Sequence, residues 1–351
     1  MTTLIHQKVS EYYGKILQTK KDLKTSACCT MDKLPAYLKE PLKLIEEEIQ
    51  MKFYGCGAPI PLVLKDMNVL DLGCGTGRDC FVLSYYVSPT GGVVGIDMTR
   101  EQLDIAEKYL PIQMKKFGFT KPNTRFIEGF IEDLKAIGLQ DKSFDIVISN
   151  CVVNLSPDKE SVLKEVFRVL KEGGEFFFSD VYADRRLPLW VKEDPVLLGE
   201  CLGGALYWKD FERLCRKVGF LDPRVYACSQ INLLDQETIA KVGFADFYSI
   251  TYRLFKLPLL EDACEDYGQM AVYKGSIQES PHHFILDNHH HFEKGKPLLV
   301  CSNTASMIQD TRLSPHFDVQ GNLSVHYGLF AGCGEKPLLS STEDQTIVGC
   351  C

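Results

Sequence analysis

The chain has 351 residues, of which 45% are hydrophobic and 25% charged, an ordinary composition for a soluble globular protein of about two domains. Its 39 Lys and Arg against 47 Asp and Glu give a formal net charge of −8, which argues against a nucleic-acid-binding protein. Residues 1–8 contain no apolar signal region, and no stretch is long enough to span a bilayer. We therefore expect a cytoplasmic protein without a membrane partner, and a monomer.

Residues 1–57 are expected to form an N-terminal arm. Residues 1–27 are polar and predicted to be helical, and Tyr13 either folds over a bound cofactor or anchors the arm to the core. Cys28 and Cys29 follow in a polar segment, and this setting argues against core positions.

The arm ends in a predicted helix and a turn. Pro35 and Pro41 bracket a short amphipathic helix. The segment Phe53-Tyr54-Gly55-Cys56-Gly57 then reads as a turn that carries one cysteine just before the first strand.

The stretch most informative about function is residues 69–79, Val-Leu-Asp-Leu-Gly-Cys-Gly-Thr-Gly-Arg-Asp. A short apolar strand leads into Asp71 and then into Gly73, Gly75 and Gly77, and a helical pattern follows. Glycines allow a sharp turn and a close approach of the backbone to a ligand. Such a strand–turn–helix unit holds the cofactor at the carboxyl edge of a parallel α/β sheet.

The spacing of these glycines distinguishes between cofactors. A dinucleotide fingerprint requires glycine where Arg78 stands. The pattern acid-x-G-x-G-x-G instead resembles motif I of class I S-adenosylmethionine (SAM) methyltransferases. The carboxylate of Asp71 suits a ligand with a cationic sulfonium and an amino-acid moiety, and Cys74 lies inside the loop, where it either contacts this ligand or fills a small space.

Residues 92–97 read as a second strand that ends in Asp97, 20 residues after Gly77. An acid at this place hydrogen-bonds the ribose hydroxyls of a nucleotide cofactor, and Met98 follows it directly. The sequence therefore predicts a ribose contact at Asp97.

A helix is predicted over residues 100–117, interrupted at Pro111. A third strand over 124–129 leads to Ile131 and Glu132, which are expected to open a short helix. In similar enzymes, an apolar residue beside an acid at this position frames the adenine ring of SAM.

The fourth strand, residues 144–150, is apolar enough to be buried on both faces and leads into Cys151. A helix is predicted from 156 to 171, stopped by Gly173 and Gly174, before a fifth strand over 176–181. A further helix over 209–218 and final strands over 224–231 and 247–255 complete residues 58–257. This alternation predicts an α/β fold with a doubly wound, mostly parallel, Rossmann-like sheet.

Fourteen cysteines are many for a chain without a secretory signal, which favours free thiols, ligands or redox pairs over a disulfide framework. Four contexts lie near the predicted carboxyl edge or on the arm: Cys28, Cys56, Cys151 and Cys201. Soft elements select thiolate ligands, and As(III) fits because it binds sulfur and keeps a nucleophilic lone pair. For other cysteines we expect the role of a small buried hydrophobe: Cys80, Cys215, Cys228 and Cys264.

The combined motifs resemble arsenite methyltransferases. They are Tyr54-Gly55-Cys56-Gly57, Leu70-Asp71-Leu72-Gly73, Gly95-Ile96-Asp97-Met98-Thr99, Ser149-Asn150-Cys151 and Gly199-Glu200-Cys201-Leu202-Gly203-Gly204-Ala205-Leu206-Tyr207-Trp208. The resemblance spans about Leu4 to Lys256 and continues more weakly beyond it. It implies transfer of methyl groups from SAM to thiol-bound arsenite and methylarsenite, giving mono- and dimethylated products, and it adds Asn150 to the cofactor site.

By position, Cys151 and Cys201 match the pair that holds As(III), and Cys28 and Cys56 match a second pair that assists binding and forms a disulfide during turnover. Cys29 is an alternative to Cys28. The resemblance also implies a thiol reductant, thioredoxin or glutathione. Tyr54 either offers an aromatic face to the sulfonium or packs in the core.

Residues 258–351 are expected to form a C-terminal domain with a cysteine-containing tail, Cys333, Cys350 and Cys351. The histidines at 282–283 and 289–291 either bind a metal or lie on a solvated loop. Two rival functions remain: a SAM methyltransferase of a small organic acceptor, which needs no cysteines, and a heavy-metal binder that has kept the fold without catalysis.

Overall fold

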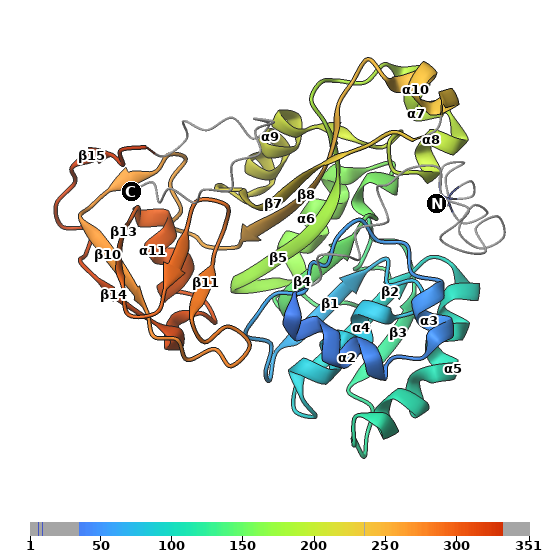
Figure 1. The fold of residues 1–351 in the computed structure, drawn as a ribbon, viewed down its shortest axis with the longest axis horizontal. Coiled ribbons are helices and arrows are strands. Elements are labelled where there is room, and N and C mark those ends of the chain that lie inside the picture. Colours follow the sequence, from blue (N-terminus) through green and yellow to red (C-terminus); the bar gives the residue numbers. More distant parts are fainter. Residues whose placement is uncertain (1–5, 7–8, 10–34, 235, 333–351) are drawn as a thin grey trace.

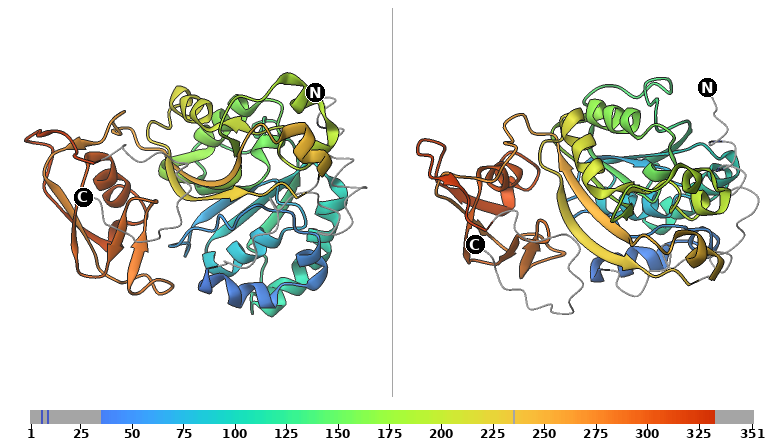
Figure 2. Two further views of the ribbon diagram at one scale, coloured as in Figure 1. Left: turned by 45° about the horizontal axis from the view of Figure 1, so that its top comes forward. Right: turned by 90° about the horizontal axis from the view of Figure 1, so that it is seen from above.

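The structure is a computed structural model that describes residues 6, 9, 35–234 and 236–332. An eight-stranded sheet with helices on both faces forms its main body, and a smaller unit from the C-terminal residues lies at one end (Figure 1, Figure 2). The predicted α/β class and doubly wound sheet are confirmed. Several predictions concern residues outside the described part: Tyr13, Cys28, Cys29, Cys333, Cys350, Cys351 and most of the expected helix over 1–27.

The central sheet has the strand order β3-β2-β1-β4-β5-β8-β7, with β6 pairing to β5. All pairs from β3 to β5, and the β5–β6 pair, are parallel, whereas β8 runs antiparallel to both β5 and β7. The strands are β1 (Asn68–Leu72), β2 (Gly92–Asp97), β3 (Thr124–Glu128), β4 (Phe144–Asn150), β5 (Leu170–Ala183), β6 (Leu206–Tyr207), β7 (Arg224–Ile231) and β8 (Phe247–Phe255).

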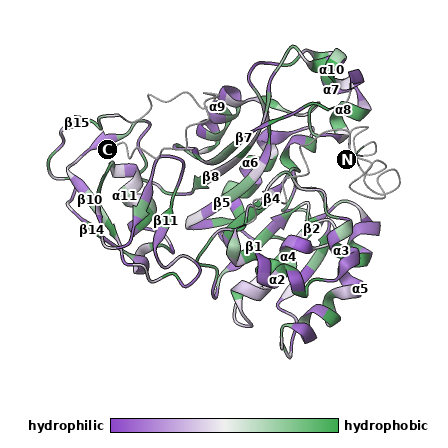
Figure 3. Ribbon diagram, in the orientation of Figure 1, coloured by the Kyte–Doolittle hydropathy of each residue, from purple (hydrophilic) through white to green (hydrophobic). Residues whose placement is uncertain are grey.

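Alternating side chains of the strands build two cores, because successive residues of a strand point to opposite faces. Val69 and Ile146 pack with the helices of one face, and Leu70 and Val147 pack with those of the other. Figure 3 shows hydrophobic residues along β1 and β4 and hydrophilic ones on the outer helices α2 and α3. The first face carries η5 (Ala36–Leu38), α2 (Lys39–Leu44), α3 (Glu47–Met51), α4 (Arg78–Val87) and α5 (Arg100–Lys116), and the second carries α6 (Lys159–Val169) and α9 (Trp208–Val218).

A third buried cluster lies where β4 and β5 end, and it contains Cys56, Cys151 and Cys201. Short helices surround it because the chain between β5 and β8 returns over this end of the sheet. The helices of this part of the chain are α7 (Leu189–Glu193), α8 (Pro195–Gly199) and α10 (Gln236–Val242). The short helix η6 (Val153–Leu155) follows β4 instead, and its Leu155 joins the same cluster.

Three predicted boundaries were wrong. The helix over 100–116 continues through Pro111, since Leu103 and Met114 on either side of it are buried in one core. The helix after 156 ends at Val169, and Gly173 and Gly174 lie inside β5, where they pair with the backbone of Lys256.

The segment after β3 also differs from the prediction. Ile131 and Glu132 lie in a turn, and no helix is described there. The carboxylate of Asp133 accepts a hydrogen bond from the backbone N–H of Ala136 at 3.0 Å, and a side chain that bonds the backbone locally favours a turn over a helix.

The C-terminal unit has its own buried cluster. It docks on the main sheet through Glu175, a fully buried carboxylate on β5 that pairs with Arg253 on β8 and with Arg312. Its elements are β9 (Glu265–Asp266), β10 (Gln269–Tyr273), β11 (His283–Ile285), β12 (His291–Glu293), β13 (Pro297–Val300), α11 (Ser302–Gln309), η7 (Ser314–His316), β14 (Phe317–Gln320) and β15 (Gly328–Leu329).

Of the four cysteines that were predicted to be buried, two are buried and two are not. Cys80 and Cys215 are buried, but Cys228 is exposed because β7 is the edge strand, and Cys264 is half-buried. In the histidine cluster, His290 is buried and its Nδ1 contacts the carboxylate of Asp287 at 2.8 Å. Within the described residues, no helix combines the length and apolar character needed to cross a membrane.

Candidate active site

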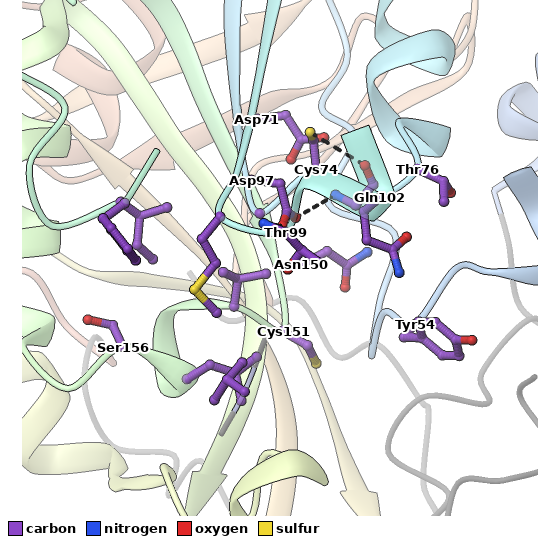
Figure 4. A pocket seen from close by; sticks show the side chains of 18 of the residues that line it. Tyr54, Asp71, Cys74, Thr76, Asp97, Thr99, Gln102, Asn150, Cys151 and Ser156 are labelled. Atoms are coloured by element: carbon purple, nitrogen blue, oxygen red, sulfur yellow. Dashed lines mark hydrogen bonds between the residues drawn. The ribbon is translucent and has the colours of Figure 1, made fainter. Parts of the chain in front are cut away.

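A pocket opens at the carboxyl ends of β1, β2 and β4 (Figure 4). Asp71 and Cys74 lie at one end of it, and Cys151 and Ser156 lie at the other. The lining residues that the sequence predicted are Tyr54, Asp71, Gly73, Cys74, Gly75, Asp97, Met98, Ile131, Glu132, Asn150 and Cys151.

Asp97 is held at the end of β2 by two backbone amides. Its carboxylate accepts from the N–H of Gly75 at 2.8 Å and from the N–H of Thr99 at 2.8 Å. Loss of solvation raises the pKa of Asp97, and these amide hydrogen bonds oppose that rise. The acid therefore has a fixed orientation that ties the glycine loop to the second strand.

Asp71 lies deeper, at the base of the loop, and is 3% exposed. Burial, together with the nearby carboxylate of Asp79, raises the pKa of Asp71 to about 8. The thiol of Cys80 donates to its carboxylate at 3.2 Å. A carboxyl group with such a raised pKa is a favourable partner for a cationic ligand, because the cation stabilises its ionised form.

The glycine loop leaves room for a ligand at one position. Gly75 has a φ of +53°, and a Cβ there would meet no atom within 4 Å, so the backbone is open to the pocket. Gly77 differs from its predicted role, because it does not line the pocket. It precedes α4, and a Cβ at this position would lie 2.9 Å from the ring of Phe126.

Asn150 anchors the turn that carries Cys56. Its side-chain amide donates to the carbonyl oxygen of Gly57 at 2.9 Å and accepts from the N–H of Gly57 at 3.2 Å. It also donates to Asp79 at 3.2 Å. The guanidinium carbon of Arg78 lies 3.0 Å from the ring centroid of Phe53 in the same turn. Residues 53–57 are thus fastened over the start of α4.

Glu132 is oriented by two side chains from distant parts of the sequence. Its Oε1 accepts from the hydroxyl of Ser156 and lies 3.0 Å from Nε2 of His6. The ring of His6 packs against Phe130, with centroids 4.6 Å apart. His6 therefore contributes to the pocket wall.

The thiol residues lie beyond Asn150. Cys151 directly follows β4, Cys201 follows α8, and both are buried. In this structure Cys151 forms a disulfide with Cys56, with Cα atoms 5.8 Å apart. The expected Cys28–Cys56 pair stays a prediction, because Cys28 is outside the described residues.

A buried carboxylate accompanies the sulfur atoms of Cys151 and Cys201. The sulfur atoms of Cys151 and Cys201 and a carboxylate oxygen of Asp180 lie within 4.8 Å of one another. Burial raises the pKa of Asp180 to about 6. Burial also lowers the pKa of the nearby Lys159 to about 8, and this lysine donates to the carbonyl oxygen of Asn154 at 3.0 Å.

Sequence reasoning missed several residues of the site, chiefly because their partners are distant in the chain. Asp180 carried a usable signal, since it is an acid near the end of a predicted strand beside the Cys151 strand. Asp79 and Thr99 lie inside the 69–79 and 95–99 motifs, but no site role was predicted for them. The other missed residues have no comparable pattern: His6, Gln102, Phe130, Ser156 and Lys159.

Comparison with known proteins agrees with this site. A methyltransferase-domain family matches residues 64–219, and an arsenite methyltransferase C-terminal domain matches residues 267–344. The arsenite methyltransferase of Aquipseudomonas alcaligenes is 54% identical, over 94% of this chain and 95% of its own length. The chain belongs to the arsenite methyltransferase family.

Two further relatives lie within this family. The human arsenite methyltransferase is 42% identical, over 89% of this chain and 83% of its own. An arsenic(III) SAM methyltransferase from Chlamydomonas reinhardtii is 53% identical in sequence. Its crystal structure matches this one with a TM-score of 0.82, and the match covers 85% of this chain and all of that one. The predicted resemblance is confirmed, and the chain is a SAM-dependent methyltransferase. A small organic acceptor is not favoured as its substrate.

Proposed function

We propose that this enzyme transfers methyl groups from SAM to As(III) held by the thiols of Cys151 and Cys201. The observation that carries the proposal is the juxtaposition of two buried cysteine sulfurs within 4.8 Å, one of them on a residue that lines the cofactor pocket. Thiolates are the ligands that soft elements select. The products are mono- and dimethylated arsenicals, with methylarsenite as the substrate of the second step.

In this proposal SAM lies along the carboxyl edge of the sheet. Asp97 binds the ribose hydroxyls, and Ile131 and Glu132 frame the adenine, while the loop at Gly75 receives the amino-acid moiety beside Asp71. Three acids therefore surround a ligand with cationic groups. The remaining proposed contacts are Tyr13, Tyr54, Gly73, Cys74, Met98 and Asn150.

The methyl transfer is a direct displacement. The arsenic lone pair forms a bond to the methyl carbon while the carbon–sulfur bond breaks and its electrons pass to the departing S-adenosylhomocysteine. Arsenic is oxidised from the trivalent to the pentavalent state, and no general base is required. Holding both reactants in one pocket supplies much of the acceleration by removing the entropy of encounter.

A second methylation requires arsenic to return to the trivalent state. Two thiols supply the two electrons and become a disulfide. We propose that Cys28 and Cys56 serve this step, that Cys56 can also add a third sulfur to arsenic, and that thioredoxin or glutathione restores the thiols. The Cys56–Cys151 disulfide supports a need for reductant, because Cys151 cannot bind arsenic while it is oxidised.

The wider organisation is also proposed. A separate buried cluster in the C-terminal unit supports a division into an arm over 1–57, a methyltransferase domain over 58–257 and a C-terminal domain with its tail over 258–351. We expect a monomer that works in the cytoplasm, where such thiol reductants are maintained.

The test is a turnover assay with SAM, arsenite and a thiol reductant, in which arsenic species are separated by chromatography. Methylated arsenic is expected from the wild type and should disappear in Cys151→Ser and Cys201→Ser. Cys228→Ser is the matched control, because this thiol is exposed on β7 and should keep full activity. Methylation that persists in both site variants would refute the proposed ligand pair.

A further inference from the structure

One buried acid at the thiol site has no role in the displacement described above. Asp180, on β5, is fully buried, and its carboxylate lies within 4.8 Å of the sulfur atoms of Cys151 and Cys201. The arsenic lone pair is the nucleophile, so the methyl transfer itself leaves this carboxylate unused. Burying an acid is costly unless it is well hydrogen-bonded.

Backbone donors fix the orientation of this carboxylate without exhausting it. Its Oδ2 accepts from the N–H of Asn154 at 2.9 Å, and its Oδ1 accepts from the N–H of Val181 at 2.8 Å. An ionised carboxylate offers about four acceptor positions. Lys159 donates to the carbonyl oxygens of Asn154 and Ser156 at 3.0 and 2.9 Å. These bonds fix the segment 154–156, which supplies the Asn154 N–H to Asp180.

The reaction of arsenite with the two thiols supplies a hydrogen-bond donor for the remaining acceptor positions of the Asp180 carboxylate. Arsenite, As(OH)3, reacts with two thiols to give a bis-thiolate that keeps one hydroxyl group. Two As–O bonds break and two As–S bonds form, while each thiol proton leaves with a hydroxide as water. Arsenic stays trivalent, and the remaining As–OH group is a hydrogen-bond donor next to the carboxylate.

We propose that Asp180 is a substrate-binding residue that accepts a hydrogen bond from this As–OH group and so orients the arsenic lone pair before Cys56 takes the third position. The inference rests on the proposed function, in which Cys151 and Cys201 hold the arsenic. Methylarsenite differs at this stage, because the same two thiols leave it with a methyl group and no hydroxyl. Asp180 therefore distinguishes the first substrate from the second.

The test uses Cys56→Ser protein, in which the Cys56–Cys151 disulfide cannot form and Cys56 cannot supply a third sulfur ligand. Affinities for arsenite and for methylarsenite are measured by calorimetry with and without the near-isosteric Asp180→Asn substitution. Loss of a hydrogen bond to a charged group is expected to weaken arsenite binding about 10- to 100-fold. Methylarsenite binding should change by less than about 2-fold, since it loses no such bond.

The comparison of the two ligands separates substrate contact from a structural role. Equal weakening of both ligands, or an unchanged affinity for arsenite, would overturn the assignment of Asp180. If the Cys56→Ser protein itself bound no arsenite, the two-thiol species would not exist, and the proposed ligand pair would fall together with this inference. Selective loss of arsenite binding supports both.

Discussion

The thiol of Cys201 lies 3.5 Å from the carbonyl oxygen of Cys151, and both residues adopt a left-handed backbone conformation, with φ of 63° and 61°. Residues other than glycine rarely adopt this conformation, and where they do, the surrounding structure must enforce it. The turn after β4 and the turn after α8 therefore direct two cysteines into one buried space. This arrangement makes a two-thiol site from residues 50 positions apart.

The turn that carries Cys201 depends on close backbone contact at Gly204. A Cβ at this position would lie 1.9 Å from the carbonyl oxygen of Asn154. Gly204→Ala should therefore displace the Cys201 turn, weaken arsenite binding strongly and destabilise the protein by about 1–3 kcal/mol. SAM binding should persist, because Gly204 does not line the cofactor pocket. Unchanged arsenite binding in a stably folded variant would count against this packing argument.

The raised pKa of Asp71 predicts that the affinity for SAM depends on pH. This pKa is raised to about 8, so in the empty pocket Asp71 is largely protonated at neutral pH, whereas a bound cation favours the carboxylate. Well below this pKa, SAM affinity should rise about tenfold per pH unit as pH increases. The empty protein should lose stability over the same range, because unfolded Asp71 releases its proton near its ordinary, lower pKa.

The matched variant for this prediction is Asp71→Asn, measured by calorimetry across the same pH range. It retains the titration of SAM itself but removes that of Asp71, so its pH profile should be flatter than that of the wild type. Identical profiles would mean that Asp71 does not titrate on binding.

His6 contacts Glu132 in the wall of the pocket, with Nε2 3.0 Å from Oε1. His6→Ala and Glu132→Gln each remove or weaken a hydrogen bond at the proposed adenine position, and each should raise the Kd for SAM about 2- to 10-fold. Glu128→Gln is the control, because this exposed residue does not line the pocket. An effect of the control as large as that of Glu132→Gln would argue against a local contact.

Glu175 joins the sheet to the C-terminal unit. Its carboxylate is 2.6 Å from Nε of Arg253 and also pairs with Arg312, and all three side chains are buried. Glu175→Gln leaves two buried guanidinium groups without their counter-charge and should lower the free energy of unfolding by about 3–5 kcal/mol. Glu172→Gln breaks only the exposed pair with Lys142 and should cost at most about 1 kcal/mol. Chemical denaturation distinguishes the two, and similar small losses would refute the role of Glu175.

Much of the central sheet was predictable because local patterns determine it. The acid and glycines after β1, and Asp97 after β2, follow from strand ends that meet at one edge of a parallel sheet. Helix ends were less predictable. The helix over 100–116 continues through Pro111 because residues before and after the proline are buried in the core, and Gly173 is paired in a strand instead of ending a helix. Both outcomes depend on tertiary contacts that the local sequence does not encode.

The residues of the site also fall into those that local sequence predicts and those that depend on tertiary contacts. Cys151 and Cys201 stand in recognisable sequence contexts, so they could be named in advance. His6, Ser156 and Asp180 acquire their roles only when folding brings them beside Glu132 or the thiols. The pairing of Cys56 with Cys151 likewise depends on the turn that Asn150 fastens, and spacing alone does not predict it.

The most direct test of the account is X-ray absorption at the arsenic edge on reduced, arsenite-loaded protein. The account predicts sulfur neighbours around arsenic, with one fewer in Cys151→Ser and in Cys201→Ser and no change in Cys228→Ser. Sulfur coordination that is the same in the wild type and in both site variants would show that arsenic is held elsewhere, and would contradict the central claim.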